Sequence, residues 1–233
     1  GRAEDISLPY KIDIIVSDWM GSRYLFHEST LDSLIKVRDK HLDKNGLMFP
    51  SHAYLYAAPC SLTEYLTDRL GYWNDAFDGF DMSPMIKHAI SEPEVMTIKP
   101  SQLLTEPFLV TGLTLKDDGG IKNDSFNERI FISVTTPGDF QGMCFYFDVE
   151  FNPSVYEYDC QIKKVHPVTF STGPASSPTR WMQTVNIMPN TANDLEVDEV
   201  IKWDYECKGQ MISKKQHFTV NVTKILDPLE DWH

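Results

Sequence analysis

The sequence has 233 residues, of which 42% are hydrophobic and 12% aromatic, with a formal net charge of −13 and a pI near 4.9. This content predicts a globular chain with a substantial core, folded as one large domain or two modest ones. The acidic balance argues against a protein that neutralises nucleic-acid phosphates, so we expect no direct nucleic-acid binding. It is compatible with basic partners such as arginine-rich protein tails.

Cysteine usage and hydropathy favour a soluble intracellular protein. Four cysteines lie far apart with no C-x-x-C pair, which predicts free buried thiols rather than a disulfide framework or a zinc site: Cys60, Cys144, Cys160 and Cys207. The seven histidines are scattered, and we predict no metal site. The sequence has no membrane-spanning apolar run and no leader segment, so we expect no membrane contact and a location in the cytoplasm and also in the nucleus.

Residues 1–50 have the pattern of an α/β unit. The apolar run Ile12–Val16 is typical of a strand buried on both faces, as in a parallel sheet flanked by helices. A helix is predicted after the capping candidates Ser29 and Thr30, with its end at Asn45-Gly46. Because so few α/β elements precede the remaining sequence, the sheet looks incomplete, and we expect a fragment, or the ordered part, of a longer chain.

Residues 61–90 are predicted to form a separate helical unit between strand-bearing regions. It carries many large apolar side chains that need a partner surface, among them Leu66, Leu70, Tyr72, Trp73, Phe77 and Phe80. Such residues usually belong to the core of their own chain. The isolation of this segment between two strand-bearing regions favours an interface instead.

The pattern is β at residues 53–59 and from about residue 94 onward, with short apolar runs separated by turn clusters such as Lys116–Gly120. Strands at this spacing are typical of an antiparallel barrel or sandwich. The predicted fold class is therefore α/β plus all-β.

Six short motifs occur in order along nearly the whole chain: IIVSDWMG, FHESTLDS, GLMFP, GFDMS, FSTGP and TRWMQTV. In this series the sequence resembles the C-terminal two-thirds of the protein arginine methyltransferase family. The resemblance implies the last part of a Rossmann-like methyltransferase domain in residues 1–50 and an antiparallel β-barrel domain in residues 51–233. A helical dimerisation arm is implied at about residues 61–90.

The resemblance also implies transfer of a methyl group from S-adenosylmethionine to a guanidinium nitrogen of arginine. Two glutamates of a hairpin hold the cation in that family, and paired carboxylates suit this task because a guanidinium presents five donors in a fixed plane. Here the matching positions are Asp18, one methylene shorter than glutamate, and Glu28. Without the motif series, both would be interpreted as ordinary surface carboxylates.

The candidate site departs from the family pattern in two further ways. Nine residues separate Asp18 from Glu28, one more than is usual in the family, and a misplacement of about 1 Å can cost roughly a hundredfold in rate. Arg180, beside Trp181, stands where the family has a histidine, and arginine cannot serve as a proton relay near neutral pH. Arg23 adds a cation within the hairpin that could pair with the carboxylates.

The cofactor site is reduced as well. No G-x-G occurs among the 12 glycines, and only Ala3 and Glu4 resemble a segment of the family that contacts the adenine. We therefore expect that this chain does not bind S-adenosylmethionine.

The preferred interpretation is a catalytically deficient regulatory subunit, a prozyme, that dimerises with a competent arginine methyltransferase paralogue and activates or stabilises it. The alternative is an active S-adenosylmethionine-dependent protein arginine N-methyltransferase whose cofactor-binding N-terminal half is absent from this sequence. A third interpretation is a scaffold that captures arginine-rich protein substrates.

Overall fold

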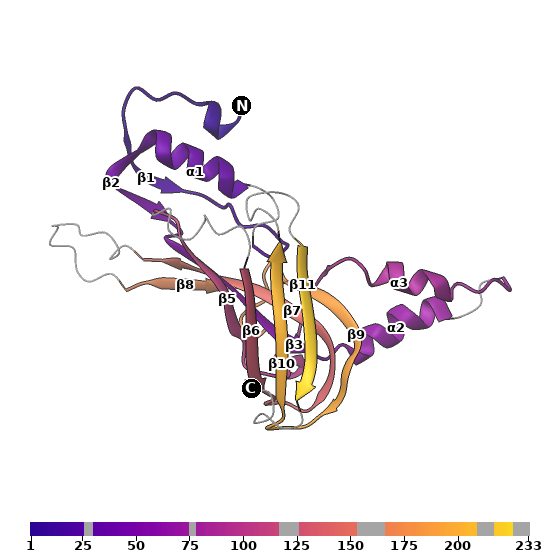
Figure 1. Ribbon diagram of the computed structural model, residues 1–233. Coiled ribbons are helices and arrows are strands. Elements are labelled where there is room, and N and C mark those ends of the chain that lie inside the picture. Colours follow the sequence, from indigo (N-terminus) through magenta and orange to yellow (C-terminus); the bar gives the residue numbers. More distant parts are fainter. Residues whose placement is uncertain (26–29, 75–77, 117–125, 153–165, 209–216, 226–233) are drawn as a thin grey trace.

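The computed structural model describes residues 1–25, 30–74, 78–116, 126–152, 166–208 and 217–225. These residues form a small α/β unit at the N-terminus, a large β region, and a pair of helices that projects away from the sheets (Figure 1). The two candidate site segments, around residues 18 and 180, lie where the α/β unit meets the β region.

The α/β unit contains two parallel strands joined through one helix. Strand β1 (Ile12–Val16) leads through the hairpin region to α1 (Thr30–His41), and β2 (Leu42–Phe49) returns beside β1. Helix α1 buries Leu31, Leu34, Arg38 and His41, a spacing of three to four residues that defines one helical face. The Arg38 guanidinium donates to the backbone oxygen of Leu115 at 2.8 Å and so ties α1 to the β region.

Two predictions for this unit are wrong. Only Ile15 of β1 is buried, while Ile14 and Val16 are 53% and 74% exposed, because β1 pairs with β2 alone among the described strands. The helix ends at His41 rather than at Asn45-Gly46, which lie inside β2. Opposite Asn45-Gly46, the pairing of β1 with β2 changes register between Ile12 and Ile14 of β1. The predicted turn is therefore an irregularity within a strand.

The β region consists of two antiparallel sheets. The six-stranded sheet has the order β4-β9-β7-β3-β5, with β8 also paired to β7. Its strands are β3 (His52–Cys60), β4 (Glu94–Met96), β5 (Phe108–Thr114), β7 (Gly138–Phe151), β8 (Val168–Ser171) and β9 (Gln183–Leu195). The three-stranded sheet has the order β11-β10-β6, from β6 (Phe126–Ser133), β10 (Val200–Lys208) and β11 (His217–Ile225). Over the described residues these sheets do not close into a barrel, and the barrel stays a prediction.

The main core lies on one face of the central strands. Alternate residues of β3 are buried against alternate residues of β7, as the two-residue period of a strand requires: Ala53, Leu55 and Ala57 on β3, with Phe145, Phe147 and Val149 on β7. Cys60 and Cys144 are buried as free thiols on the opposite face, as predicted for them. Cys160 lies outside the described residues.

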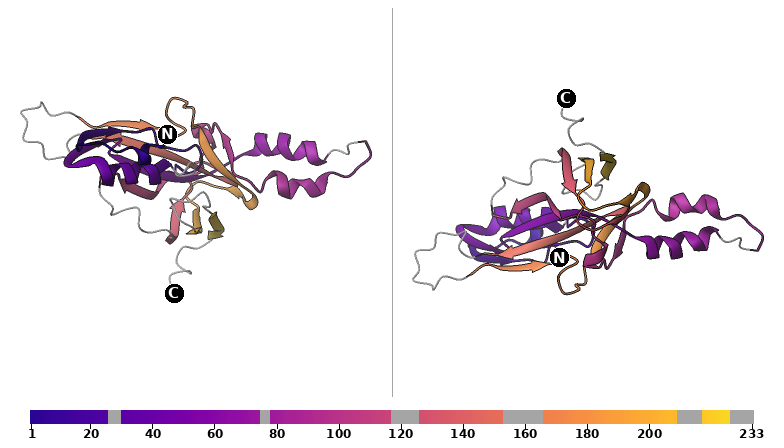
Figure 2. Two further views of the ribbon diagram at one scale, coloured as in Figure 1. Left: turned by 90° about the horizontal axis from the view of Figure 1, so that it is seen from above. Right: turned by 90° about the horizontal axis from the view of Figure 1, so that it is seen from below.

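The projecting helices lie within the segment where helices were predicted. They are α2 (Thr63–Asn74) and α3 (Ile86–Ala89), with the short 3-10 turn η2 (Ser83–Met85) before α3, and we call these helices and the described residues between them the arm (Figure 2). Two further 3-10 turns, η1 (Ala3–Asp5) and η3 (Pro100–Gln102), lie elsewhere in the chain. None of the described helices is long and apolar enough to cross a membrane.

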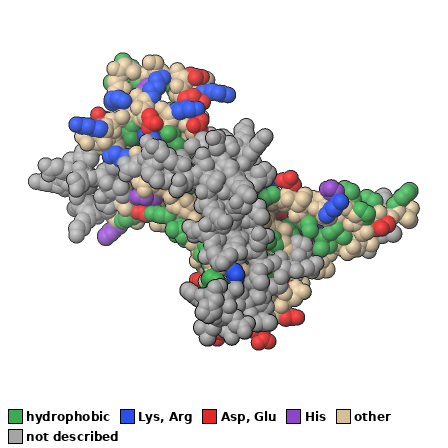
Figure 3. Space-filling view, viewed as in Figure 1, with side chains coloured by type: hydrophobic (Ala, Val, Ile, Leu, Met, Phe, Trp, Pro, Cys, Tyr) green, Lys and Arg blue, Asp and Glu red, His purple; other side chains and the backbone are tan. Residues whose placement is uncertain are grey.

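The base of the arm is packed and its outer part is open. Leu62 and Leu66 are buried in a second apolar cluster with Cys60, Cys144 and Ile98, and Leu70 packs against it. Farther out, Tyr72 and Phe80 are 67% and 69% exposed. Hydrophobic side chains cover much of the arm on the face seen in Figure 3. Such an apolar surface is typical of a protein interface.

Candidate functional site

The hairpin that follows β1 carries the first candidate residue. Strand β1 ends at Val16, and the backbone N–H of Ser17 donates to the backbone oxygen of Phe49 at 3.0 Å. This bond to β2 fixes the backbone just before Asp18. Asp18 then points outward with 55% of its side chain exposed, whereas Trp19 is buried. Glu28, the second predicted carboxylate, lies outside the described residues.

The turn of the hairpin is held in an unusual backbone conformation. Tyr24 and Leu25 have φ values of 49° and 68°, in the left-handed region that non-glycine residues seldom adopt. Both side chains are buried, and the Gly21 N–H donates to the Leu25 oxygen at 2.9 Å. Packing of the two large side chains therefore offsets the backbone strain.

The segment before and within β9 carries the second set of candidate residues. Arg180 is exposed, and Trp181 packs edge-on against Phe147 and Phe170 at ring distances of 5.8 and 5.5 Å. The Trp181 Nε1–H donates to the backbone oxygen of Met20 at 3.1 Å. Trp181 thus joins the β region to the hairpin.

Further hydrogen bonds continue this attachment, and sequence reasoning missed all of them. The Thr184 hydroxyl donates to the Ser22 oxygen at 2.9 Å, and the Tyr24 hydroxyl bonds the Asn186 side chain. Burial raises the pKa of Tyr24, while the bond to Asn186 acts in the opposite direction. The sequence signal that could have predicted these bonds is the spacing of Thr184 and Asn186 along β9, since alternate strand residues project to the same face.

The tyrosine bond gives a direct test of this attachment. We expect Tyr24→Phe to lower the free energy of unfolding by about 1–1.5 kcal/mol, because the substitution leaves the Asn186 oxygen without its donor. Urea denaturation of Tyr24→Phe and of Tyr10→Phe, whose ring is 68% exposed, measures the difference. Equal stabilities of the two variants would contradict the attachment.

The central contact of the site joins Arg180 to Asp18. The Arg180 guanidinium donates directly to the Asp18 carboxylate, and its central carbon lies 4.4 Å above the centre of the Trp181 ring. Although Asp18 and Arg180 are far apart in the sequence, Arg180 is paired with Asp18, the residue at the position of the family's substrate-holding glutamate. Both side chains are more than half exposed, so the pair contributes at most about 1 kcal/mol to stability.

The other candidate cation pairs elsewhere. Arg23 lies 3.8 Å from Glu92, near the base of the arm, so the predicted pairing of Arg23 with the hairpin carboxylates is not found among the described residues. Chemically, the described site presents one carboxylate already paired with a guanidinium.

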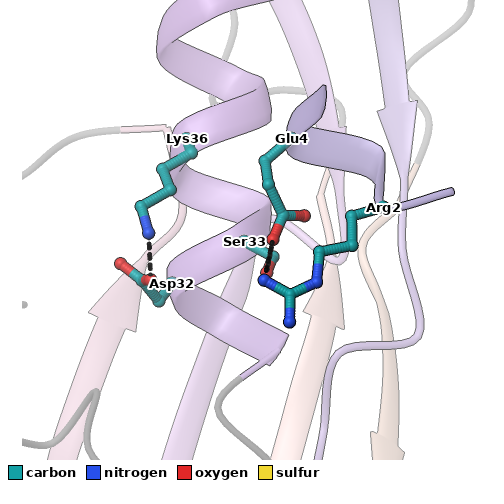
Figure 4. A network of polar contacts seen from close by, with 5 residues as sticks. All are labelled: Arg2, Glu4, Asp32, Ser33 and Lys36. Atoms are coloured by element: carbon teal, nitrogen blue, oxygen red, sulfur yellow. Dashed lines mark hydrogen bonds and ion pairs between the residues drawn. The ribbon is translucent and has the colours of Figure 1, made fainter. Parts of the chain in front are cut away.

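The residues that resemble the cofactor-binding segment lie apart from this pair. Ala3 and Glu4 form η1, beside α1, where the Ser33 hydroxyl donates to the Glu4 carboxylate at 3.2 Å and Arg2 lies 4.0 Å away (Figure 4). A backbone hydrogen bond and Ser33 lower the pKa of Glu4. S-adenosylmethionine needs contacts from several sides, and these described residues offer one edge whose carboxylate is engaged with α1. On their own they do not fit the cofactor.

The predicted dimerisation residues divide into two groups. Leu66 is buried and Leu70 partly buried at the base of the arm, where they pack within this chain. Tyr72 and Phe80 are exposed, with Tyr72 edge-on to Trp73 at 5.0 Å. Phe77 lies outside the described residues. The exposed group is therefore the part of the arm that is open to a partner.

Comparison with known proteins identifies relatives over most of the chain. Residues 51–222 match the arginine methyltransferase oligomerization subdomain. Protein arginine N-methyltransferase 1 of Schizosaccharomyces pombe is 35% identical over 213 residues, covering 89% of this chain and 57% of the relative. Protein arginine N-methyltransferase 1 of Saccharomyces cerevisiae is 31% identical, over 89% and 56%. The chain thus spans little more than half of the length of these relatives.

Solved structures share the fold. A chain of the Trypanosoma brucei PRMT1 enzyme-prozyme heterotetrameric complex with AdoHcy superposes with a TM-score of 0.76 and 22% identity, over 96% of this chain and 72% of that one. Arabidopsis thaliana protein arginine methyltransferase 10 gives a TM-score of 0.68 and 22% identity, over 95% and 73%. From the subdomain match and these relatives, the chain belongs to the protein arginine methyltransferase family.

Proposed function

We propose that this protein is a catalytically deficient regulatory subunit of an arginine methyltransferase complex, which dimerises with a competent paralogue and activates or stabilises it. The pairing of Arg180 with Asp18 carries the proposal. A substrate guanidinium would have to displace a tethered one and would meet its positive charge, whose repulsion at about 4 Å is on the order of 1–4 kcal/mol near a protein surface.

The shape of the site supports the same proposal. Asp18 is shorter than the family's glutamate, and the loop that would hold a histidine presents the guanidinium of Arg180, which has hydrogen-bond donors and no acceptor. Trp19 and Trp181 nevertheless keep the hairpin packed on the β region. In this proposal the packing that positions the hairpin is kept, while the residues that would bind the substrate guanidinium are changed.

The arm supplies the surface for assembly in this proposal. Its exposed aromatic side chains, Tyr72 and Phe80, are suited to packing on a second subunit, as aromatic residues are enriched at interface centres. The Trypanosoma brucei neighbour is named as an enzyme-prozyme heterotetramer, which gives a precedent for such an assembly on this fold. The predicted barrel and dimerisation arm are part of the proposal.

Titration of S-adenosylmethionine into the full-length protein tests the proposal. We expect no heat of binding from the protein alone, and a severalfold rise in methyl transfer when it is mixed with a competent family member, because a partner that binds the folded state stabilises it by mass action. Micromolar binding together with methyl transfer to an arginine peptide by the isolated protein would overturn it.

A matched pair of variants sharpens that experiment. Asp18→Asn in this protein should leave the activity of the mixture unchanged, whereas the amide variant of the matching carboxylate in the competent partner should abolish it. Loss of activity from Asp18→Asn would place the reaction in this chain.

The competing function is an active arginine methyltransferase, favoured by the identity of 35% to protein arginine N-methyltransferase 1 of Schizosaccharomyces pombe. In that case Arg180 would have to swing away from Asp18 when substrate binds, which the exposure of both side chains permits. The same titration separates the two functions.

A further inference from the structure

A second group of aromatic and acidic residues lies on the face of the six-stranded sheet opposite the main core. Tyr54 on β3 lies directly opposite Asp148 on β7, and Tyr56 lies opposite Tyr146. Directly opposed residues of an antiparallel pair project to the same face with Cβ atoms about 4.5–5.5 Å apart. The face thus places aromatic rings beside a carboxylate.

A pocket of about 320 Å³ opens where this face meets the segment Pro100–Pro107. Its polar and aromatic lining includes Glu106, Tyr146, Asp148 and Ser171, and we call it the acid-tyrosine pocket. No lysine, arginine or histidine is among the described residues that line it. Its volume is at the lower end of the roughly 300–1,000 Å³ of ligand sites, so it can accept one long side chain.

The carboxylate of this pocket lacks a full set of partners. The Oδ1 atom of Asp148 is buried and has no hydrogen-bond partner within the described parts of the chain. Burial raises the pKa of Asp148, and a hydrogen bond with Ser171 acts in the opposite direction. Buried carboxylate oxygens are costly without a donor or a cation. Asp148 thus lines the pocket with a carboxylate that the described residues do not fully satisfy.

The tyrosine of the pocket is held from two sides. Its ring stacks on Tyr56 at 5.4 Å with an angle of 21° between planes. A Cβ atom at Gly173 would come within 2.8 Å of the Tyr146 ring, so only glycine lets the backbone approach this closely. A guanidinium in the pocket can contact the open part of this fixed ring with its planar face and donate N–H groups to a carboxylate, a combination that its shape suits better than that of an ammonium.

We propose that the acid-tyrosine pocket binds the guanidinium of an arginine in a basic peptide, as a capture site separate from the hairpin. The inference rests on the proposed function, in which a subunit without turnover holds substrates for its partner. A peptide held in this pocket of one subunit would be present at a higher effective concentration at the active site of the other subunit. The net charge of −13 complements a basic peptide.

The test uses a fluorescein-labelled Gly-Arg repeat peptide and the full-length protein without partner, so its result does not depend on activation. In fluorescence anisotropy, we expect Asp148→Asn to weaken binding about tenfold or more, as expected for loss of a charged hydrogen bond. Asp139→Asn is the matched control, because it removes the same charge from a different pocket and keeps the oxygen that accepts from the Asp194 N–H. It should change binding less than twofold.

Stability separates recognition from folding in this test. Burial raises the pKa of Asp148 in the folded state. At pH values above its ordinary pKa, ionisation of Asp148 therefore lowers the stability of the folded protein. Asp148→Asn should therefore have an unchanged or higher Tm while binding weakens. Equal weakening by both variants, no weakening by either, or equal affinity for a Gly-Lys repeat peptide would each overturn the pocket. Partner activation, assayed on the same variants, reports separately on the proposed function.

Discussion

Full-length protein carrying both Tyr72→Glu and Phe80→Glu is expected to bind its competent partner about a thousandfold more weakly. Both rings are about two-thirds exposed on the arm. An aromatic anchor at the centre of an interface contributes about 2 kcal/mol, so two such anchors account for about 4 kcal/mol, and each 1.4 kcal/mol is a factor of ten in the dissociation constant. Sedimentation velocity at micromolar concentrations of the two proteins measures the loss, and activation of the partner should disappear with it.

Val197→Glu is the control for this experiment, because it places the same charge at an apolar position that is 50% exposed between β9 and β10, outside the exposed outer part of the arm. All three substituted side chains are exposed, so the stability of each variant should stay within about 0.5 kcal/mol of the parent protein. Assembly of the double variant at wild-type affinity would contradict the arm as the interface.

The sequence predicts most of the strands because their apolar alternation is a local signal. Strands β3, β5 and β7 lie where that alternation occurs. Strand β2 was not predicted, and the preceding helix was extended into it, because Asn45-Gly46 gives a strong local turn signal while the pairing of Leu47 with Ile14 is non-local. Strand β8 was not predicted, since it has only four residues and depends on pairing with β7.

The candidate site shows the same limit. The motif series identified Asp18, Arg180 and Trp181, because each stands at a position defined by its neighbours in sequence. It could not determine which cation pairs with Asp18. Arg23 is close in sequence, but Arg180 makes the contact, because the path of the chain between β8 and β9 brings it to the hairpin. The acid-tyrosine pocket likewise depends on strand register, which residue types alone do not determine.

Trp181→Ala is expected to lower the free energy of unfolding by about 3 kcal/mol. Large aromatic deletions in a core cost roughly 3–5 kcal/mol, and the lower end applies because Trp181 is only partly buried. The substitution removes edge contacts with Phe147 and Phe170 as well as the donor to Met20. Denaturant unfolding gives the difference, and hydrogen exchange should show faster opening of residues 19–25.

Arg180→Ala separates packing from charge at this site, because the two residues are adjacent and both contact the hairpin. Removing an exposed ion pair should cost about 1 kcal/mol at most. A small effect from Arg180 beside a large one from Trp181 means that the loop holds the hairpin through the tryptophan. Arg180 then contributes mainly its positive charge next to Asp18 and little to the packing of the hairpin. A loss below about 1 kcal/mol from Trp181→Ala would contradict this division, since other contacts, such as those of Tyr24 and Thr184, would then hold the hairpin.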